Sequence, residues 1–491
     1  MAYEQPQKET KIFLLKVLVD RYRKKNVFVE ASKDFVDTLF SFLSLPLATI
    51  VRLLATNNND HQQLPESSPF LENIKNLYQS VQNITSNDVW NNPACKQMLL
   101  RPRNPCESMC NELFLNIDDT EPTSKFYVCS FCDKFTTFEN LNCTCGNPPN
   151  RQPRNLDSDG QGNNAQNGVF VRESGPMFLV TDDLKIVPSS MLISMQLLKE
   201  SRISDLCYLK EVTHNIGKQE ILNLLKYALT SHEPLTNTIL ASSSKIKYNP
   251  PYQSASAIKV MPCTSDRSKM DIKVLQSNSQ KKIIIAEANG DFVDFIFSFL
   301  TIPLGSIVKL LGPNSFAGCV GNLYKSIENL DPTSVLLNPG VAPQFGCPNQ
   351  PLNIPHSIPP CTVYYYGTET RKRMRDHHYN TEKEKIEEVI SKSYKSVFYR
   401  RNVTALDPRE GTVGFVKRAT LYGVGDDLKV TPLAPNSFLS YLKELGLPLD
   451  DLEVKVITIG KAEALSLLGA FLTSKFTFTS GLQDFLNVAK Q

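Results

Sequence analysis

The sequence carries little net charge and no uninterrupted hydrophobic run. Its 491 residues include 53 Lys and Arg and 50 Asp and Glu, which leaves a formal net charge of +3. Such a balanced chain has no overall field to attract nucleic acid or an anionic membrane. The longest apolar stretch, residues 292–311, matches a bilayer span in length, but Pro303 interrupts it, and Asp294 and Lys309 lie near its ends. We therefore expect two short buried helices joined at the proline, and no membrane association.

The first residues lack the apolar core of a secretory leader. The segment "MAYEQPQKETK" is polar and mixed in charge, so we expect a protein of the cytoplasm or nucleus. In that reducing environment the twelve cysteines would bind metal or pack as small apolar groups. A hydrophobic content of 41% and a charged content of 21% are typical of a soluble globular protein.

The sequence also lacks the compact motifs of common enzyme classes. None of its six histidines belongs to an HExxH pattern, and no GxSxG serine is present. The triplet "IGK" occurs at 216–218 and 459–461, without the first glycine of a P-loop or the Ser/Thr after the lysine. The run "GVGDDL" begins like a dinucleotide-binding loop but has Leu428 in place of the third glycine. These absences favour a non-enzymatic protein.

What the sequence does have is an internal repeat. The run "DFVDTLFSFLSLPLATIVRLL" (34–54) returns as "DFVDFIFSFLTIPLGSIVKLL" (291–311), with fourteen of the 21 positions identical. Shorter matches follow in the same order, such as "NLYQSVQNI" with "NLYKSIENL" and "TDDLK" with "GDDLK". Colinear matches along both halves predict a tandem duplication of one domain-sized unit.

Each unit has the pattern of an α+β fold. A pair of strands precedes buried helices, and a long insert, a hairpin and a helix–strand–helix segment follow. In the first unit we expect the buried helix to begin with Asp34 as its N-cap and the next helix to begin at Pro46. The segment "MFLVTDDLKIVP" predicts a hairpin around its Asp-Asp turn.

The repeat also gives the domain boundaries. We predict a first unit, a Ser- and Pro-rich linker and a second unit at residues 1–245, 246–270 and 271–491. The first unit carries a four-cysteine insert (129–145) and a Gly-, Asn- and Gln-rich loop (151–168), which we expect to be disordered. The second unit carries a highly charged loop (367–396), which is interpreted as a mobile loop or an exposed helix.

The four-cysteine insert is the strongest candidate site. Its spacing is C-x2-C, ten residues, then C-x-C followed by Gly146, and the cysteines are Cys129, Cys132, Cys143 and Cys145. Two close pairs across a loop can complete a tetrahedron of thiolates around Zn2+, and four thiolates leave no open position, so this zinc would be structural. Buried reduced thiols and a redox pair are the alternatives. Cys106 and Cys110 are either spare ligands or buried thiols of a short helix.

Carboxylates repeat at the junction of the second strand and the first helix. The repeated pairs are Glu30 and Glu287, Asp34 and Asp291, and Asp37 and Asp294. Helix caps and the helix dipole account for acids at this position. The alternative is an enzyme of unknown class that uses Glu30 and Glu287 in a cleft between the copies.

One dense basic run, "RKRMRDHH" (371–378), raises the possibility of nucleic-acid binding. A nucleic-acid-binding protein would use this run together with the zinc region. The run is followed by "EKEKIEE" and has few aromatic residues near it, which favours one end of a solvated charged loop. A protein partner of unknown identity is therefore the preferred interpretation.

The repeated unit, with "EASKDFVDTLFSFLSLPL", "LNIDDTEPTSKFYVCS", "NCTCG" and "DDLKVTP", resembles the plant domain-of-unknown-function 674 family along essentially the whole chain. The resemblance implies plant origin, a soluble duplicated α+β protein and no established activity. The second copy lacks the four-cysteine cluster and keeps only Cys361 in the equivalent region. The function expected from the sequence is binding or interaction, with one structural zinc site.

Overall fold

A computed structural model gives the fold of most of the chain. It describes residues 11–56, 68–120, 127–129, 131, 134–136, 143, 145–147, 168–171, 177–203, 205–240, 269–316, 318–347, 351–357, 362–368, 385–391, 394–402, 404–405, 409, 414–433, 442–443, 446 and 448–488. The loop predicted at 151–168 falls outside these residues except for Gly168, and nearly all of the predicted linker 246–270 falls outside them as well.

The first half contains a five-stranded antiparallel sheet with the order β6-β5-β2-β1-β7. Its strands are β1 (Phe13–Asp20), β2 (Lys25–Ser32), β5 (Met177–Thr181), β6 (Ile186–Pro188) and β7 (Leu209–Ile216). Burial alternates along most of β1, because successive side chains of a strand point to opposite faces. Strands β5 and β6 form the hairpin that was predicted around the Asp-Asp turn.

The second half contains a sheet with the equivalent order, β15-β14-β9-β8-β16. Its strands are β8 (Met270–Ser277), β9 (Lys282–Ala288), β14 (Tyr422–Gly425), β15 (Val430–Pro432) and β16 (Leu452–Ile459). The two sheets also share local irregularities. A register shift follows Leu18 in β1 and Leu275 in β8, and Lys24 and Lys281 have left-handed φ angles of 54° and 52°. The expectation of one strand order in both halves is met.

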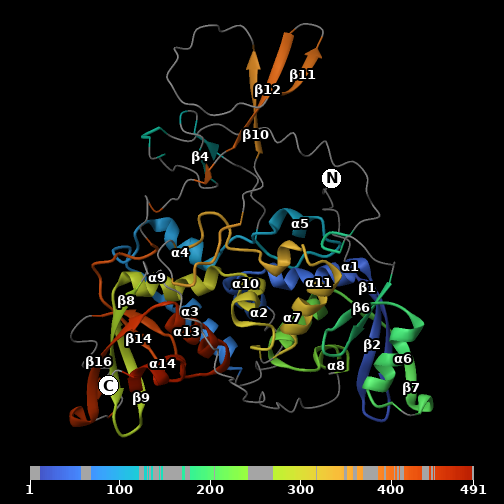
Figure 1. Ribbon diagram of the computed structural model, residues 1–491, viewed down its shortest axis with the longest axis horizontal. Helices are drawn as coiled ribbons and strands as arrows, with labels where there is room; N and C mark the ends of the chain where they lie inside the picture. Colours follow the sequence, from blue (N-terminus) through green and yellow to red (C-terminus); the bar gives the residue numbers. More distant parts are fainter. Residues whose placement is uncertain are drawn as a thin grey trace, which may run out of the picture.

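Helices pack between the two sheets, and helix α6 (Met191–Glu200) lies on the outer side of the first sheet (Figure 1). Those of the first half are α1 (Lys33–Phe40), η1 (Ser41–Ser44), α2 (Leu47–Thr56), α3 (Pro69–Asn83), α4 (Pro93–Leu100), α5 (Glu107–Asn111), α6 (Met191–Glu200), η2 (Leu206–Tyr208), α7 (Lys218–Thr230) and α8 (Pro234–Ile239). Those of the second half are α9 (Gly290–Ser298), η3 (Phe299–Thr301), α10 (Leu304–Leu311), α11 (Val320–Leu330), η4 (Val335–Leu337), η5 (Leu449–Asp451), α13 (Lys461–Thr473) and α14 (Thr477–Val488).

Two details of the helix starts differ from the sequence prediction. The N-cap of α1 is Ser32, so Asp34 lies inside the first turn and is not the cap. Pro46 immediately precedes α2, whose first residue is Leu47. The apolar stretch 292–311 forms the short buried helices α9, η3 and α10, interrupted at Pro303 as expected. Among the described helices, none is both long enough and apolar enough to cross a bilayer.

The two halves meet through a reciprocal pair of backbone hydrogen bonds. The amide of Leu47 donates to the carbonyl of Ile302 at 3.2 Å, and the amide of Leu304 donates to the carbonyl of Leu45 at 3.1 Å. Pro46 and Pro303 form the bridge between these bonds. The proline that immediately precedes the second buried helix of each half therefore lies where the two halves join.

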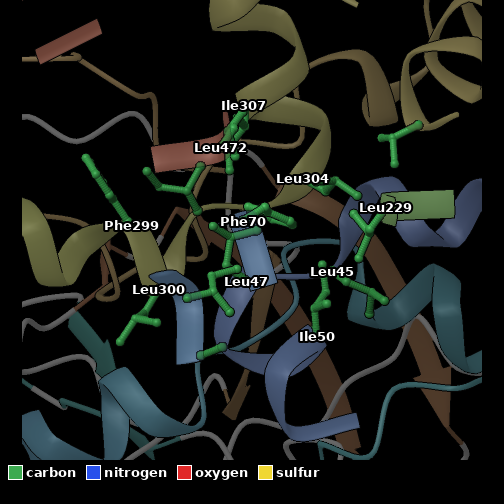
Figure 2. Packing of buried hydrophobic residues seen from close by; sticks show 14 of the residues in the cluster. Leu45, Leu47, Ile50, Phe70, Leu229, Phe299, Leu300, Leu304, Ile307 and Leu472 are labelled. Atoms are coloured by element: carbon green, nitrogen blue, oxygen red, sulfur yellow. The ribbon is translucent and has the colours of Figure 1, made fainter. Parts of the chain in front are cut away.

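Helices α3 and α11 each pack against the sheet of the opposite half. Helix α3 contacts α13 and β15, and α11 contacts β6 and α1. Asn76 on α3 donates to the carbonyl of Asp427 at 3.0 Å, and its counterpart Asn322 on α11 donates to the carbonyl of Asp183 at 2.8 Å. This exchange of helices gives the two halves one continuous hydrophobic core. Figure 2 shows side chains of both halves packed together: Leu45, Leu47, Ile50, Phe70 and Leu229 from the first, and Phe299, Leu300, Leu304, Ile307 and Leu472 from the second.

Two small sheets complete the described architecture. Strands β10 (Thr362–Thr368), β12 (Tyr394–Asn402) and β11 (Lys385–Ser391) form one antiparallel sheet in that order. The segment 367–396, predicted as a charged loop or exposed helix, therefore includes strand β11 and the start of β12, and its residues 369–384 lie outside the described part. The other sheet joins β3 (Tyr127–Val128) and β4 (Lys134–Thr136) to β13 (Thr404–Ala405) of the second half.

Candidate metal centre

The first cysteine of the cluster lies in the connection between the two strands of a short hairpin. Strands β3 and β4 pair in antiparallel fashion, with Tyr127 opposite Thr136. Cys129 comes directly after β3, and its amide donates to the carbonyl of Lys134 at 2.8 Å. This bond closes the hairpin next to Cys129. Strand β13 adds to β4 in parallel, so a segment of the second half supports the hairpin.

The second cysteine pair lies in a turn that requires glycine. The amide of Gly146 donates to the carbonyl of Cys143 at 2.8 Å, and the amide of Cys143 donates to the carbonyl of Asn147 at 3.1 Å. Gly146 has a φ angle of +80°, in the left-handed region that side chains with a Cβ avoid. The glycine after the C-x-C pair thus allows the chain to turn back.

Three cysteine sulfurs converge at this place. The thiol sulfurs of Cys129, Cys143 and Cys145 all lie within 4.8 Å of one another, and the sulfurs of Cys129 and Cys145 are 3.5 Å apart. A disulfide would bring two sulfurs to about 2.05 Å. Ligands of one tetrahedral zinc ion, each about 2.3 Å from the metal, are about 3.8 Å apart. The separation therefore fits a shared metal ion better than a covalent bond.

The surroundings of these sulfurs also fit a metal centre. Cys129 and Cys143 are buried, whereas Cys145 is exposed. The side-chain amide of Asn147 lies 3.6 Å from the sulfur of Cys145, where it can donate to a thiolate. Hydrogen bonds of this kind hold the ligands of metal sites in place. Three soft sulfur donors in a cluster of this size could bind a metal ion.

The other cysteines named from the sequence have different positions. Cys132, the predicted fourth ligand, lies outside the described residues. Cys106 is the N-cap of helix α5 and Cys110 lies within this helix; both are buried, and neither belongs to the group of converging sulfurs. The sulfur of Cys110 lies 3.5 Å from the hydroxyl of Ser44. Burial raises the pKa of Cys110 to about 12, so this thiol stays protonated at neutral pH. The interpretation as buried thiols therefore suits this pair better than that of spare ligands.

The repeated carboxylates have a role that capping does not describe. Asp37 lies in the middle of α1 and accepts hydrogen bonds from the amides of Val169, Phe170 and Val171, at 2.7, 3.0 and 3.0 Å. In the second half, Asp294 accepts from the amides of Phe415 and Val416. Both carboxylates bind the chain where it returns from the long insert of its own half.

This anchoring role was missed from the sequence, although a signal was present. Asp37 and Asp294 are charged residues in runs that are otherwise apolar, and the runs occur in both halves. A buried charge in such a run needs several hydrogen-bond donors. A glycine also lies beside each of these two carboxylates. In the second half, a Cβ built on Gly414 would lie 1.5 Å from a carboxylate oxygen of Asp294.

The structure does not bring Glu30 and Glu287 together. Glu30 belongs to β2 and Glu287 to β9, and these strands lie at opposite sides of the molecule (Figure 1). Glu287 instead forms an ion pair with Lys273, 3.0 Å away on the neighbouring strand. The basic run 371–378 lies outside the described residues.

Comparison with known families gives one match. A family model with the description "Protein of unknown function (DUF674)" matches residues 8–462, which is nearly the whole chain and includes the cysteine cluster and both large sheets. No curated protein and no solved structure matches this chain.

Proposed function

The chain belongs to the DUF674 family, and we propose that it is a non-enzymatic binding protein whose cysteine cluster holds one structural zinc ion. The observation that carries the proposal is the convergence of three cysteine sulfurs within 4.8 Å. Cys129, Cys143 and Cys145 are three of the ligands, and the C-x2-C spacing makes Cys132 the fourth. A complete shell of four thiolates leaves no position for water or substrate, which is why the zinc is structural.

We infer that the fold is a tandem duplication and that only its first copy acquired this metal centre. The shared strand order, the matched register shifts and the reciprocal asparagine bonds support the duplication. Thiolate ligands remain reduced in the cytoplasm and nucleus, so the proposal assigns the protein to one of these compartments.

The metal would order a part of the molecule that connects its two halves. Residues Lys134 and Phe135 of β4 pair with Thr404 and Ala405 of β13. The strands of this small sheet are only two or three residues long, so metal binding would supply much of its folding free energy. Phe131, which is 73% exposed, lies between the first two ligands of the proposed site. An exposed aromatic side chain on a metal-ordered turn is suited to contact a protein partner.

The test is a measurement of zinc in the full-length protein, purified under reducing conditions and dialysed. We expect about one zinc ion per chain, and we expect Cys129→Ser and Cys145→Ser each to reduce this content at least tenfold. Cys207 is an exposed cysteine elsewhere in the first half, so Cys207→Ser is the matched control and should retain the metal. Chelation should speed proteolysis at residues 127–147 and leave the two large sheets intact. Wild-type protein without stoichiometric zinc would rule out the proposal.

A further inference from the structure

A second candidate site lies at one end of the first sheet, away from the cysteine cluster. A cavity of about 320 Å³ opens between the β1–β2 turn, the β5–β6 turn, the end of α6 and the segment before α8. This volume is in the range of small-molecule sites, and it equals the share of roughly ten water molecules in the liquid. Its wall includes Asn26, Asp182, Leu197 and Glu233.

The three cationic side chains of this wall are each paired with one of its carboxylates. Lys25 forms an ion pair with Glu233, and Lys185 and Asp183 approach to 3.5 Å. The guanidinium of Arg23 donates to the carbonyls of Ser201 and Arg202 and lies 3.7 Å from Asp20.

Asp182, another carboxylate of the wall, is also engaged. It accepts hydrogen bonds from the amide and the hydroxyl of Thr236, at 2.7 and 2.6 Å. Asp182 and Glu200 are carboxylates of the wall beyond its three ion pairs, so acidic side chains outnumber basic ones and the wall disfavours anionic ligands.

Asn26 is the exception in this wall. Its side chain is 4% exposed, and neither its amide nitrogen nor its amide oxygen has a hydrogen-bond partner within the described part of the chain. Buried polar groups without a partner are rare, and each one calls for an explanation. Asparagine presents one donor and one acceptor side by side, so the partner that satisfies it must present the complementary pair.

The second half shows that the fold does not need this amide. The aligned runs "KNVFVEASKD" and "KIIIAEANGD" place Ile283 at the position of Asn26. The backbone role is the same at both positions: the amide of Asn26 donates to the hydroxyl of Thr236 at 2.8 Å, and the amide of Ile283 donates to the hydroxyl of Thr479 at 2.9 Å. Isoleucine fills this position in the core of the second half, with 1% of its surface exposed.

A second polar residue of the wall is replaced in the same way. Glu233, which pairs with Lys25 in the first half, corresponds to Phe476, whose ring lies 4.3 Å from the amine of Lys282. The correspondence follows from the shared hydroxyl contacts of Thr236 and Thr479, three residues further along. The polar cavity wall is thus a feature of the first half alone at these two positions.

We propose that this cavity binds a small neutral molecule with a hydrogen-bond donor and acceptor side by side, and that the side-chain amide of Asn26 recognises this pair. Carboxamides, lactams and the edges of nucleobases have this arrangement, and asparagine forms such a paired contact with adenine. The excess of carboxylates in the wall disfavours anionic ligands, and its three basic side chains are already paired. Leu197 and Val27 supply apolar surface beside the amide.

The test uses the full-length protein and three neutral probes, nicotinamide, uracil and adenine, in ligand-observed NMR titrations. We expect saturable binding of at least one probe, with benzoate and benzylamine, which lack the neutral pair, at least tenfold weaker. Asn26→Ile, which copies the second half, should weaken binding tenfold or more. Asn26→Ala should weaken binding to the same extent. Because alanine removes the amide without filling the cavity, this variant distinguishes loss of the amide from loss of space.

The matched control is Asn215→Ile, which changes an exposed asparagine on strand β7 and should leave binding unchanged. Circular dichroism establishes that each variant is folded, and Asn26→Ile is expected to fold because isoleucine occupies the equivalent site. The proposal is overturned if none of the three probes binds saturably, if benzoate or benzylamine binds as well as they do, or if both Asn26 variants bind with wild-type affinity.

Discussion

At the scale of single residues, the two buried aspartates show how the long inserts return to the core. A carboxylate inside an apolar helix is costly unless donors surround it. Asp37 and Asp294 meet this requirement with backbone amides from the segment that follows each insert. Burial is nevertheless the largest influence, and it raises the pKa of Asp37 and raises that of Asp294 to about 7.

This raised pKa predicts the direction of a pH effect on stability. An unfolded aspartate has a pKa of about 3.9, so between pH 4 and 7 the folded state holds a proton at Asp294 that the unfolded state has released. The stabilising contribution of this proton is fully present below about pH 4 and is lost as pH rises to about 7. In wild-type protein we expect the free energy of unfolding to fall across this window, with at most about 1.4 kcal/mol per pH unit from Asp294.

Asp294→Asn removes this titration while keeping an oxygen acceptor for the two amides. The variant should therefore show a shallower fall in the free energy of unfolding between pH 4.5 and 6.5. Urea unfolding at both pH values measures the difference. Comparison with wild type isolates Asp294, because burial also raises the pKa of Asp182 to about 7 and that group titrates in both proteins. Asp88→Asn, at an exposed site, is the control; equal slopes in all three proteins would contradict the prediction.

At the scale of secondary-structure elements, the exchanged helices connect the two halves. The side-chain amide of Asn73 on α3 donates to the carbonyls of Phe471 and Ser474 at the end of α13, at 2.8 and 2.7 Å. Asn73 is fully buried. These carbonyls belong to the last turn of a helix, where no intrahelical amide is available to them.

Replacing Asn73 with leucine should therefore destabilise the whole molecule. Leucine fits the apolar surroundings but leaves two carbonyls without their donor, which costs roughly 1–3 kcal/mol. Asn83→Leu, at the exposed end of the same helix, makes the same chemical change without these bonds. Urea unfolding of both variants measures the difference, and equal midpoints for N73L and N83L would show that α3 contributes little to joining the halves.

The elements themselves were largely predictable, whereas the exchange was not. The run "FLLKVLVD" and the apolar residues around Phe35 predict a strand followed by a buried helix, and the structure has both as expected. The same apolar face of α3 could cover either sheet, because the two halves present nearly identical surfaces. The local sequence pattern therefore predicts helix α3 but does not determine which of the two sheets it packs against.

The candidate sites also differ in how far they could be predicted from the sequence. Short spacing keeps Cys143 and Cys145 together, and the turn at Gly146 is local, so the convergence with Cys129 could be predicted from the sequence. The cavity beside Asn26 combines a turn, a helix end and a segment about 200 residues away from it. No local sequence pattern predicts a cavity formed by segments so far apart. The only sequence signal is that Ile283 takes the place of Asn26 in the second half.

At the scale of the whole molecule, the two halves are related like the subunits of an isologous dimer that exchanges one helix. Each half gives a helix to the other, and the bonds at Leu45, Leu47, Ile302 and Leu304 are the same in both directions. Exchange of identical elements is a common route to dimers. Here the two halves belong to one chain, so the covalent link between them fixes their ratio at one to one. The contact between the halves is made by the exchanged helices, and the link adds little to it.

Cutting the chain between the halves should therefore leave the molecule assembled. A specific protease site can be placed at residues 246–268, within the predicted linker. Cleavage there separates the first half from the second and leaves α3 and α11 uncut. Each fragment still has a helix in the core of the other, and removing it would expose buried side chains such as Phe70 and Leu323. We expect the two fragments to elute together in native size-exclusion chromatography, at the position of the uncut protein, and to separate only in denaturant.

Asn73→Leu should lower the denaturant concentration at which the cut fragments separate, and Asn83→Leu should not. Fragments that elute apart without denaturant would mean that the covalent link, rather than the helix exchange, holds the two halves together.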